Sequence, residues 1–286
     1  MTWIPRSIRD MPSAQIQWEG PFSGVPDWLA PHLDGWVWSV FFQGTAGGRE
    51  HYWTHGLEQI QLDLHLTLDW TNQGRSASQS LISHRISDGD TYLDIVDWCI
   101  AHTENPELPG ILQRYLDSSA SLYTITRLEG RRPALTERVI DTVAEAVHTA
   151  APPNSRAAEY LALAWSNIYG RVKDPSSGYR DAIRAVEAAA KPVVSPTNTL
   201  TTLGTIISDI SAKPEKWKFS LTPESGADPF EALLGQMRLI WKGQLDRHGT
   251  DDDAVPVSVS IAEAEVALHI AALLVHLFTS GAVSRV

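Results

Sequence analysis

The chain has 286 residues and a mass of 31.5 kDa, with 43% hydrophobic and 20% charged residues. These values are typical of a globular protein and exclude wholesale disorder. The single cysteine, Cys99, excludes an internal disulfide framework. No apolar stretch follows Met1 and no run approaches eighteen apolar residues, so we expect a soluble, cytoplasmic protein that does not contact a membrane.

Negative charge is concentrated in the first half of the chain, although the net charge of −11 belongs to the whole. Residues 1–150 carry 10 Lys and Arg against 19 Asp and Glu, whereas residues 151–286 carry 13 against 15. Sequence-independent nucleic-acid binding needs basic surface that releases counterions. The balance therefore disfavours loose nucleic-acid binding but leaves room for a local basic cleft in the second half.

The first part of the chain is rich in tryptophan, proline and glycine. We expect short helical turns near Pro26 and Pro31, a helix through Phe42 and a turn over residues 44–48. Helices are predicted further along over residues 76–85, 90–102 and 109–118, followed by a small hairpin around residues 122–133 and a helix over 134–150.

Residues 59–70 are ambiguous. Strict alternation from Ile60 to Trp70 predicts a half-buried strand, whereas Leu57, Ile60, Leu64 and Leu68 form a helical row. Leucine is a helix former and the surrounding chain is helical, which slightly favours a helix.

A linker is predicted at Ala151-Pro152-Pro153-Asn154, because two prolines cannot continue a helix. This boundary gives a Trp-rich, acidic, mostly helical region over 1–152 and a second domain over 153–286. Ser155 is predicted to open the first helix of that domain and Asp174-Pro175 the second, which should end at Lys191-Pro192. A third helix carries the apolar residues between Leu200 and Ile210.

The last two predicted helices flank a polar corner. Asp228 is a good N-cap with Pro229 in the first turn, and the apolar row from Phe230 to Leu245 has helical spacing. Arg247-His248-Gly249 and the acidic run 251–253 follow. Ser258 or Ser260 then caps a final helix that Gly281 ends. Five helices with short connections predict an antiparallel bundle and a mainly α protein.

His248, with Arg247 beside it and Lys242 six residues earlier, is a candidate catalytic group. A histidine near neutral pH can serve as general base or acid, and the cations can hold a phosphate. The alternative is a helix C-terminus, where cationic side chains interact with the helix dipole and a glycine caps.

This arrangement resembles the HEPN superfamily, helical bundles found in abortive-infection proteins, toxins and phage-defence nucleases. Its motif is an arginine followed after four to six residues by a histidine, near the end of one helix and before the last. His248-Gly249 matches the histidine end, and Lys242 falls where the arginine is expected. The resemblance covers about residues 155–281. It implies a metal-independent ribonuclease with catalytic residues His248, Arg247 and Lys242, RNA as a partner and a homodimer.

A second reading of the same fold remains open. Lysine lacks the bidentate fork of arginine, and this substitution, with the net acidity, favours a non-catalytic binding module whose N-terminal region recognises a protein or nucleic-acid partner. No cofactor or metal is expected. His51 and His55 have the i, i+4 spacing of helical metal sites but lack an evident third ligand, so packing or loop roles are favoured for them.

Overall fold

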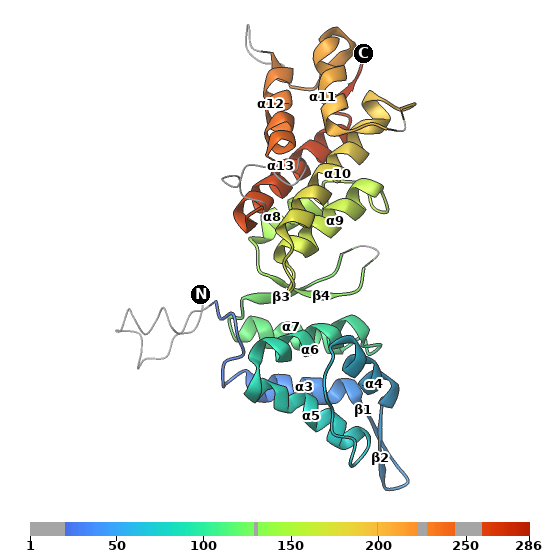
Figure 1. Cartoon of the computed structure of the whole chain (residues 1–286), viewed down its shortest axis with the longest axis vertical. Helices are drawn as coiled ribbons and strands as arrows, with labels where there is room; N and C mark the ends of the chain where they lie inside the picture. Colours follow the sequence, from blue (N-terminus) through green and yellow to red (C-terminus); the bar gives the residue numbers. More distant parts are fainter. Residues whose placement is uncertain (1–20, 129–130, 199, 222–227, 244–258) are drawn as a thin grey trace, which may run out of the picture. The chain divides into compact units, whose positions relative to one another are not determined.

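The computed structural model describes residues 21–128, 131–198, 200–221, 228–243 and 259–286 (Figure 1). The fold is mainly helical, as the sequence predicts. Two compact units form: unit 1 includes the chain up to Arg127 together with Arg132–Arg138, and unit 2 includes Leu128–Arg131 and Val139–Val286. The division falls before residues 141–148, a helix that the sequence-based boundary at 152 assigned to the first domain. Val147, Ala150 and Ala151 are buried in the core of unit 2, which explains the difference.

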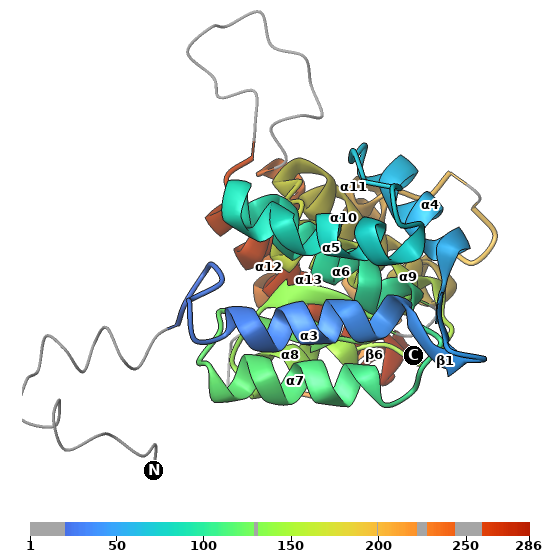
Figure 2. The same ribbon diagram turned by 90° about the horizontal axis from the view of Figure 1, so that it is seen from below.

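Unit 1 consists of five helices and two hairpins within the described residues. They are, in order, α3 (Ala30–Phe41), β1 (Phe42–Ala46), β2 (Arg49–Tyr52), α4 (Thr54–Asp63), α5 (Gly74–Ser87), α6 (Gly89–His102), α7 (Leu108–Ser118), β3 (Tyr123–Thr126) and β4 (Ala134–Glu137). Strands β1 and β2 pair with each other, as do β3 and β4, both antiparallel. Figure 2 shows α3 running beside α7.

Large aromatic side chains connect the elements of unit 1. The indole of Trp36 in α3 donates to the carbonyl of Leu108 at the start of α7, at 2.9 Å. The rings of Phe41, Trp53 and Trp98 pack against one another with centroids about 6 Å apart. Trp36, Trp53 and Trp98 therefore pack in a core that belongs to unit 1.

Two sequence predictions in the first half need correction. The helical row that begins at Leu57 ends with α4 at Asp63, and the alternating residues after it form neither helix nor strand in the structure. The predicted helix over 134–150 is wrong in its first half, because Ala134–Glu137 is strand β4 and helix α8 covers only Asp141–His148. The backbone N–H of Leu135 donates to the Asp97 carboxylate at 2.6 Å, a contact that local periodicity cannot reveal.

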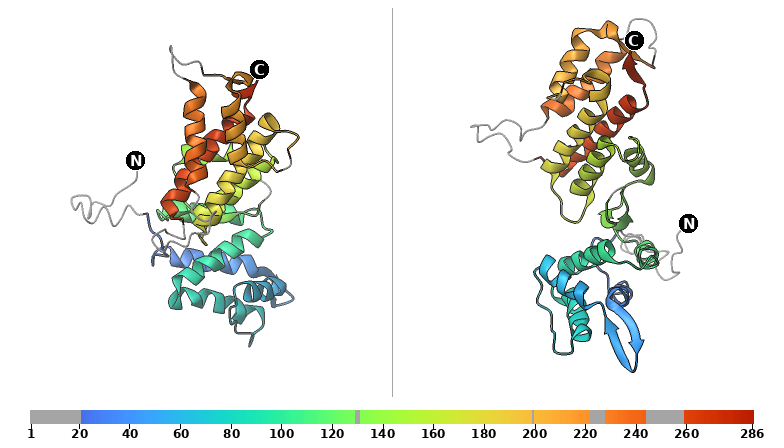
Figure 3. Two further views of the ribbon diagram at one scale, coloured as in Figure 1. Left: turned by 45° about the horizontal axis from the view of Figure 1, so that its top comes forward. Right: turned by 90° about the vertical axis from the view of Figure 1, so that its right-hand side faces the viewer.

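Unit 2 is a bundle around one long central helix, α10. The described elements are α8 (Asp141–His148), α9 (Arg156–Tyr169), α10 (Pro175–Val194), α11 (Leu203–Ala212), a 3-10 turn (Pro214–Lys216), β5 (Trp217–Phe219), α12 (Pro229–Lys242), α13 (Ile261–Thr279) and β6 (Val283–Arg285). Helices α9 and α13 pack along α10, and α11 packs on both α10 and α12 (Figure 3).

Predicted capping residues start four of these helices. Ser155 accepts from the N–H of Ala158, and Asp174 from that of Ser177. Asp228 likewise accepts from the backbone N–H of Phe230 at 2.9 Å. Ser260 forms a reciprocal capping box with Glu263.

Two features of unit 2 differ from expectation or go beyond it, and a third agrees with it. Pro192 lies inside α10 and does not end it, because Val194 is buried in the core and holds the last turn in place. Gly281, with φ of +77°, turns the chain after α13 as expected. The residues beyond it form β6, which pairs antiparallel with β5, a sheet absent from the sequence prediction.

Helix α13 is the one helix among the described residues that is long and apolar enough to cross a membrane. It has 19 residues, and its most apolar window has a mean hydropathy of 1.7. Its buried face, which includes Leu268, Val275 and Phe278, belongs to the core that it shares with α9 and α10. Packing in a protein core accounts for this apolar face.

Candidate functional site

Only one of the three predicted catalytic residues falls within the described structure. Lys242 is exposed in the last turn of α12, where a cation interacts favourably with the helix dipole. Arg247 and His248 lie in residues 244–258, outside the described residues, and so does the acidic run 251–253. The structure therefore describes the residues on either side of this segment, which are the end of α12 before it and the start of α13 after it.

The departing end, at the C-terminus of α12, is held by Tyr179 of α10. The buried Tyr179 hydroxyl donates to the carbonyl oxygen of Ile240 at 2.8 Å. A Cβ atom built on Gly243 would lie only 2.6 Å from that hydroxyl oxygen, so glycine permits the close approach. Similarly, a Cβ atom on Gly204 in α11 would lie 2.7 Å from the ring of Trp241. The end of α12 is thus fitted against two neighbouring helices.

The returning end is attached to the same helix. The N–H of Val259 donates to the hydroxyl oxygen of Ser176 in the first turn of α10, at 3.4 Å. Ser260 follows, and its capping box with Glu263 starts α13. The described residues on either side of 244–258 are therefore hydrogen-bonded to the first turns of α10.

Charged side chains lie near the first turns of α10, among them Asp174, Arg180 and Glu263. Arg180 follows Tyr179 and is exposed, with its guanidinium donating to the hydroxyl of Ser177 at 2.7 Å. Hydrogen bonds from the Ser260 side chain and backbone lower the pKa of Glu263, which keeps it a carboxylate. Burial, and secondarily the charge of Glu263, raises the pKa of Tyr179 to about 12, so its hydroxyl remains a donor at neutral pH.

Two acidic residues of α10 serve as structural tethers, a role that sequence analysis did not assign. The Asp181 carboxylate, 6% exposed, accepts from the Asn167 amide of α9 and from Arg184, both at 3.2 Å. Glu187 accepts from the backbone N–H of Leu203 at 2.7 Å, at the start of α11. Sequence analysis could not find these tethers, because Asn167 lies 14 residues from Asp181 and Leu203 lies 16 residues from Glu187.

The other candidate groups do not assemble into a site. His51 lies in β2 and His55 in α4, so the i, i+4 geometry of a helical metal site does not apply to them. Asp97 accepts the hydrogen bond from Leu135, which ties α6 to β4. Across the described ranges, no group of three or more His, Cys, Asp or Glu side chains is placed to hold a metal ion.

Comparison with known proteins gives no relative to guide the assignment. No family model, no curated protein and no solved structure matches the chain. The function is therefore inferred from the chemistry of the residues at the first turns of α10 and at the C-terminus of α12.

Proposed function

We propose that this is a phage-defence or abortive-infection-type protein whose second unit cleaves RNA without a metal ion. In this proposal His248 acts as general base or acid, and Arg247 and Lys242 hold the phosphate. The observation that carries it is that α10 binds the described residues on both sides of 244–258, Ile240 through Tyr179 and Val259 through Ser176, with Lys242 exposed in the last turn of α12. Arg180 adds a cation at the same end of the bundle.

The proposed reaction needs one proton acceptor, one proton donor and a clamp for the phosphate. The base removes the proton of a ribose 2′-hydroxyl, and the 2′-oxygen attacks the adjacent phosphorus. The bond to the 5′-oxygen breaks, and that oxygen takes a proton from the acid. The products are a cyclic phosphate and a 5′-hydroxyl, and the cations offset the charge that develops on the phosphate oxygens.

The proposal includes a homodimer, in which two copies of the motif face one RNA. Light scattering of the purified protein tests this part, with twice the 31.5 kDa chain mass as the expected result. A monomeric mass under the conditions of cleavage would remove the two-copy arrangement.

The decisive experiment is cleavage of bulk tRNA and mRNA in the presence of a chelator. Wild-type protein is compared with His248→Ala, expected to lose at least about 100-fold in rate, as expected for loss of a general acid–base group. Lys242→Ala is expected to lose about 10-fold or more, and Lys242→Arg to retain or exceed wild-type activity because arginine grips phosphate with two donors.

Matched controls separate a lost catalytic group from a lost charge. Lys216→Ala removes an exposed lysine from the 3-10 turn, and His55→Ala removes an exposed histidine of unit 1. Both should cleave like wild type. The nuclease proposal would be contradicted if the cleavage products carried no cyclic phosphate. It would also be contradicted if a folded His248→Ala protein still cleaved RNA at the wild-type rate.

A non-catalytic binding module is the second candidate, and one feature of unit 1 favours it. Trp28 is 59% exposed, with Phe22 edge-on to its ring at 5.2 Å, as suits a recognition surface for a partner. Absence of cleavage in wild-type and variant proteins alike would favour this module. A co-purification that recovers no partner would count against it, and a partner lost in Trp28→Ala would support it.

A further inference from the structure

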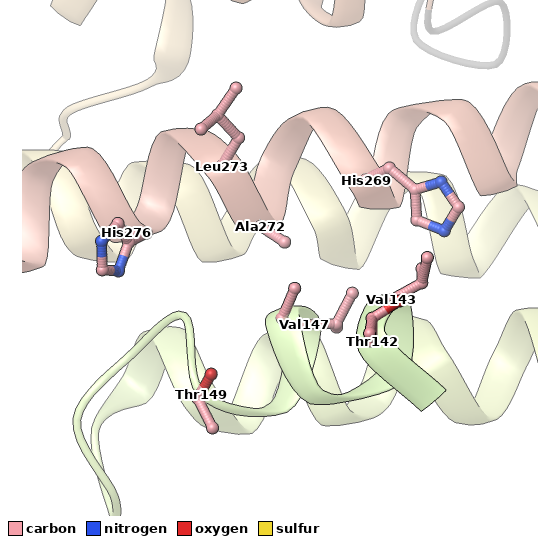
Figure 4. A pocket seen from close by; sticks show the side chains of 9 residues that line it. Thr142, Val143, Val147, Thr149, His269, Ala272, Leu273 and His276 are labelled. Carbon is pink, nitrogen blue, oxygen red and sulfur yellow. The ribbon is translucent and has the colours of Figure 1, made fainter. Parts of the chain in front are cut away.

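Unit 2 contains a pocket that the proposed RNA cleavage does not use. It lies between α8 and α13, with a volume of about 510 Å³, within the range of small-molecule sites. Its lining residues are Thr142, Val143, Ala146, Val147, Thr149, His269, Ala272, Leu273 and His276. Figure 4 shows α13 on one side and α8 on the other, with both histidine rings on the side of α13 that faces α8.

The lining is apolar in the middle and polar at both ends. Val147 and Ala272 are almost fully buried and form part of the apolar wall. His269 and Thr142 lie toward one end in Figure 4, and His276 and Thr149 toward the other. The two histidines are two helical turns apart, a distance of about 10 Å along α13.

The pocket is held by contacts behind its walls. His269 Nε2 lies 3.3 Å from the hydroxyl of Tyr169, and the buried Tyr169 ring packs on Trp165 with centroids 4.5 Å apart. At the other end, Thr279 of α13 donates to the carbonyl of Ala150 at 3.0 Å, which ties α13 to the residues after α8. The His269 ring is thus preorganised, which lowers the entropic cost of binding at its end of the pocket.

The chemistry of the lining selects the ligand. Apart from the two histidines, none of the lining residues is ionisable, so neither end offers a permanent charge to pair with a charged group. The hydroxyl of Thr149 donates to the carbonyl of Glu145 at 2.7 Å, which leaves its oxygen as an acceptor for a ligand. Histidine supplies a donor or an acceptor as needed.

We infer that this pocket binds a medium-chain amphiphile, with an apolar body between two hydrogen-bonding ends. The apolar body would lie along Val147 and Ala272, one end group between His269 and Thr142, and the other between His276 and Thr149. This binding function is separate from RNA cleavage and does not need residues 244–258.

Titration of the full-length protein with 1,10-decanediol, whose two ends are uncharged hydroxyls, tests the inference, monitored by the methyl resonances of Val143, Val147 and Leu273. A ligand of this size is expected to bind with a dissociation constant of about 1 mM or lower. 1-Decanol lacks the second polar end and should bind at least about threefold more weakly. Equal affinities would overturn recognition at two ends, and the absence of saturable shifts in these methyls would overturn the site.

A matched pair of variants on α8 checks the location. Ala146→Trp places a ring in the pocket from an exposed position, whereas Glu145→Trp adds the same ring on the neighbouring exposed position outside the lining. We expect about a tenfold loss of affinity in the first and less than about a twofold change in the second. Equal loss or equal retention in the two variants, with unchanged thermal unfolding, would contradict binding between α8 and α13.

Discussion

Tyr179 and Ile240 join the central helix of unit 2 to the last turn of α12, through a 2.8 Å hydrogen bond from the tyrosine hydroxyl to the backbone carbonyl. The hydroxyl oxygen of Ser176, one turn earlier in α10, accepts a hydrogen bond from the backbone N–H of Val259. One helix therefore holds both ends of the segment that carries Arg247 and His248. Any function of that segment depends on these anchors as well as on its own side chains.

Tyr179→Phe should destabilise the protein by about 1–2 kcal/mol, because it removes the donor and leaves a carbonyl oxygen facing a buried ring edge. Urea unfolding monitored by circular dichroism measures the change. Tyr160→Phe is the matched control, since its ring is retained beneath Arg184, and it should stay within about 0.5 kcal/mol. A Tyr179→Phe protein as stable as the control would show that the hydrogen bond contributes nothing.

The same tyrosine predicts a loss of stability at alkaline pH. Its pKa rises from 10.0 to about 12 on folding. Since the unfolded chain releases the proton first, stability is fully present below pH 10 and falls as the pH rises toward 12. The loss is at most about 3 kcal/mol for a shift of this size. Buried Tyr92, whose pKa is also raised by burial, contributes in the same direction.

Comparison of wild type with Tyr179→Phe isolates this contribution, because Tyr92 is common to both proteins. The variant should lose less stability than wild type between about pH 10 and about pH 12. Parallel curves for the two proteins would contradict a raised pKa at Tyr179.

Glycine substitutions test the fit of α12 against its neighbours. Gly204→Ala would place a Cβ atom 2.7 Å from the Trp241 ring, whereas Gly235→Ala on α12 meets nothing within 4 Å. The first should destabilise by about 1–3 kcal/mol through overpacking. The second should stabilise by up to about 1 kcal/mol, because alanine is the better helix former. If the Gly204→Ala and Gly235→Ala variants shifted the denaturant midpoint by the same amount and in the same direction, the close Gly204–Trp241 contact would be contradicted.

Short-range signals in the sequence predicted where four helices of unit 2 begin. Ser155, Asp174, Asp228 and Ser260 each cap the helix expected of them, because a cap involves only the next two or three residues. Gly281 also ends α13 as expected. Helices of unit 2 therefore follow from local chemistry and an apolar periodicity.

Long-range contacts account for what the sequence could not predict. Strand β5 pairs with β6 across more than sixty residues, and β4 receives a hydrogen bond from Asp97 of α6. Neither the pairing of β5 with β6 nor the hydrogen bond to Asp97 can be recognised from the residue periodicity of the segments involved. The two-proline linker was equally misleading as a boundary, because Ala150 and Ala151 before it are buried in unit 2.

The candidate site shows the same division. The sequence places Lys242 on a helix expected to run through Leu245, and the structure places it in the last turn of α12, which ends earlier, at Lys242. The roles of Tyr179 and Ser176 could not be predicted from the sequence, because each contacts a residue more than sixty positions away. Periodicity marks Tyr179 as a core residue but does not reveal its hydrogen bond to α12.

The tether at Asp181 should stabilise the packing of α9 on α10. Asp181→Ala removes the acceptor of Asn167 and Arg184, and we expect a destabilisation of about 1–3 kcal/mol. A double-mutant cycle with Asn167→Ala should give a coupling energy of about 1 kcal/mol. Glu231→Ala, an exposed carboxylate in the first turn of α12, is the control. Additive losses at Asp181 and Asn167 would contradict the tether.

His148 makes the stability of unit 2 sensitive to mild acid. Its ring packs edge-on to Trp165 with centroids 4.7 Å apart, and although the residue is exposed overall, desolvation of the ring on this side lowers its pKa below the usual 6.5. The unfolded chain therefore takes up the proton first as the pH falls. The stability associated with a neutral His148 is present above pH 6.5 and is lost below it.

His148→Phe keeps an aromatic ring beside Trp165 but cannot titrate, so it should lose less stability than wild type between about pH 7.5 and about pH 5.5. Urea midpoints across this range measure the difference. The control is His55→Gln, whose side chain is 81% exposed and which should follow the wild-type curve. If the urea midpoints of His148→Phe and His55→Gln both fell with pH as steeply as that of wild type, the acid sensitivity would belong to another group. The environment of the His148 ring would then have no effect on folding.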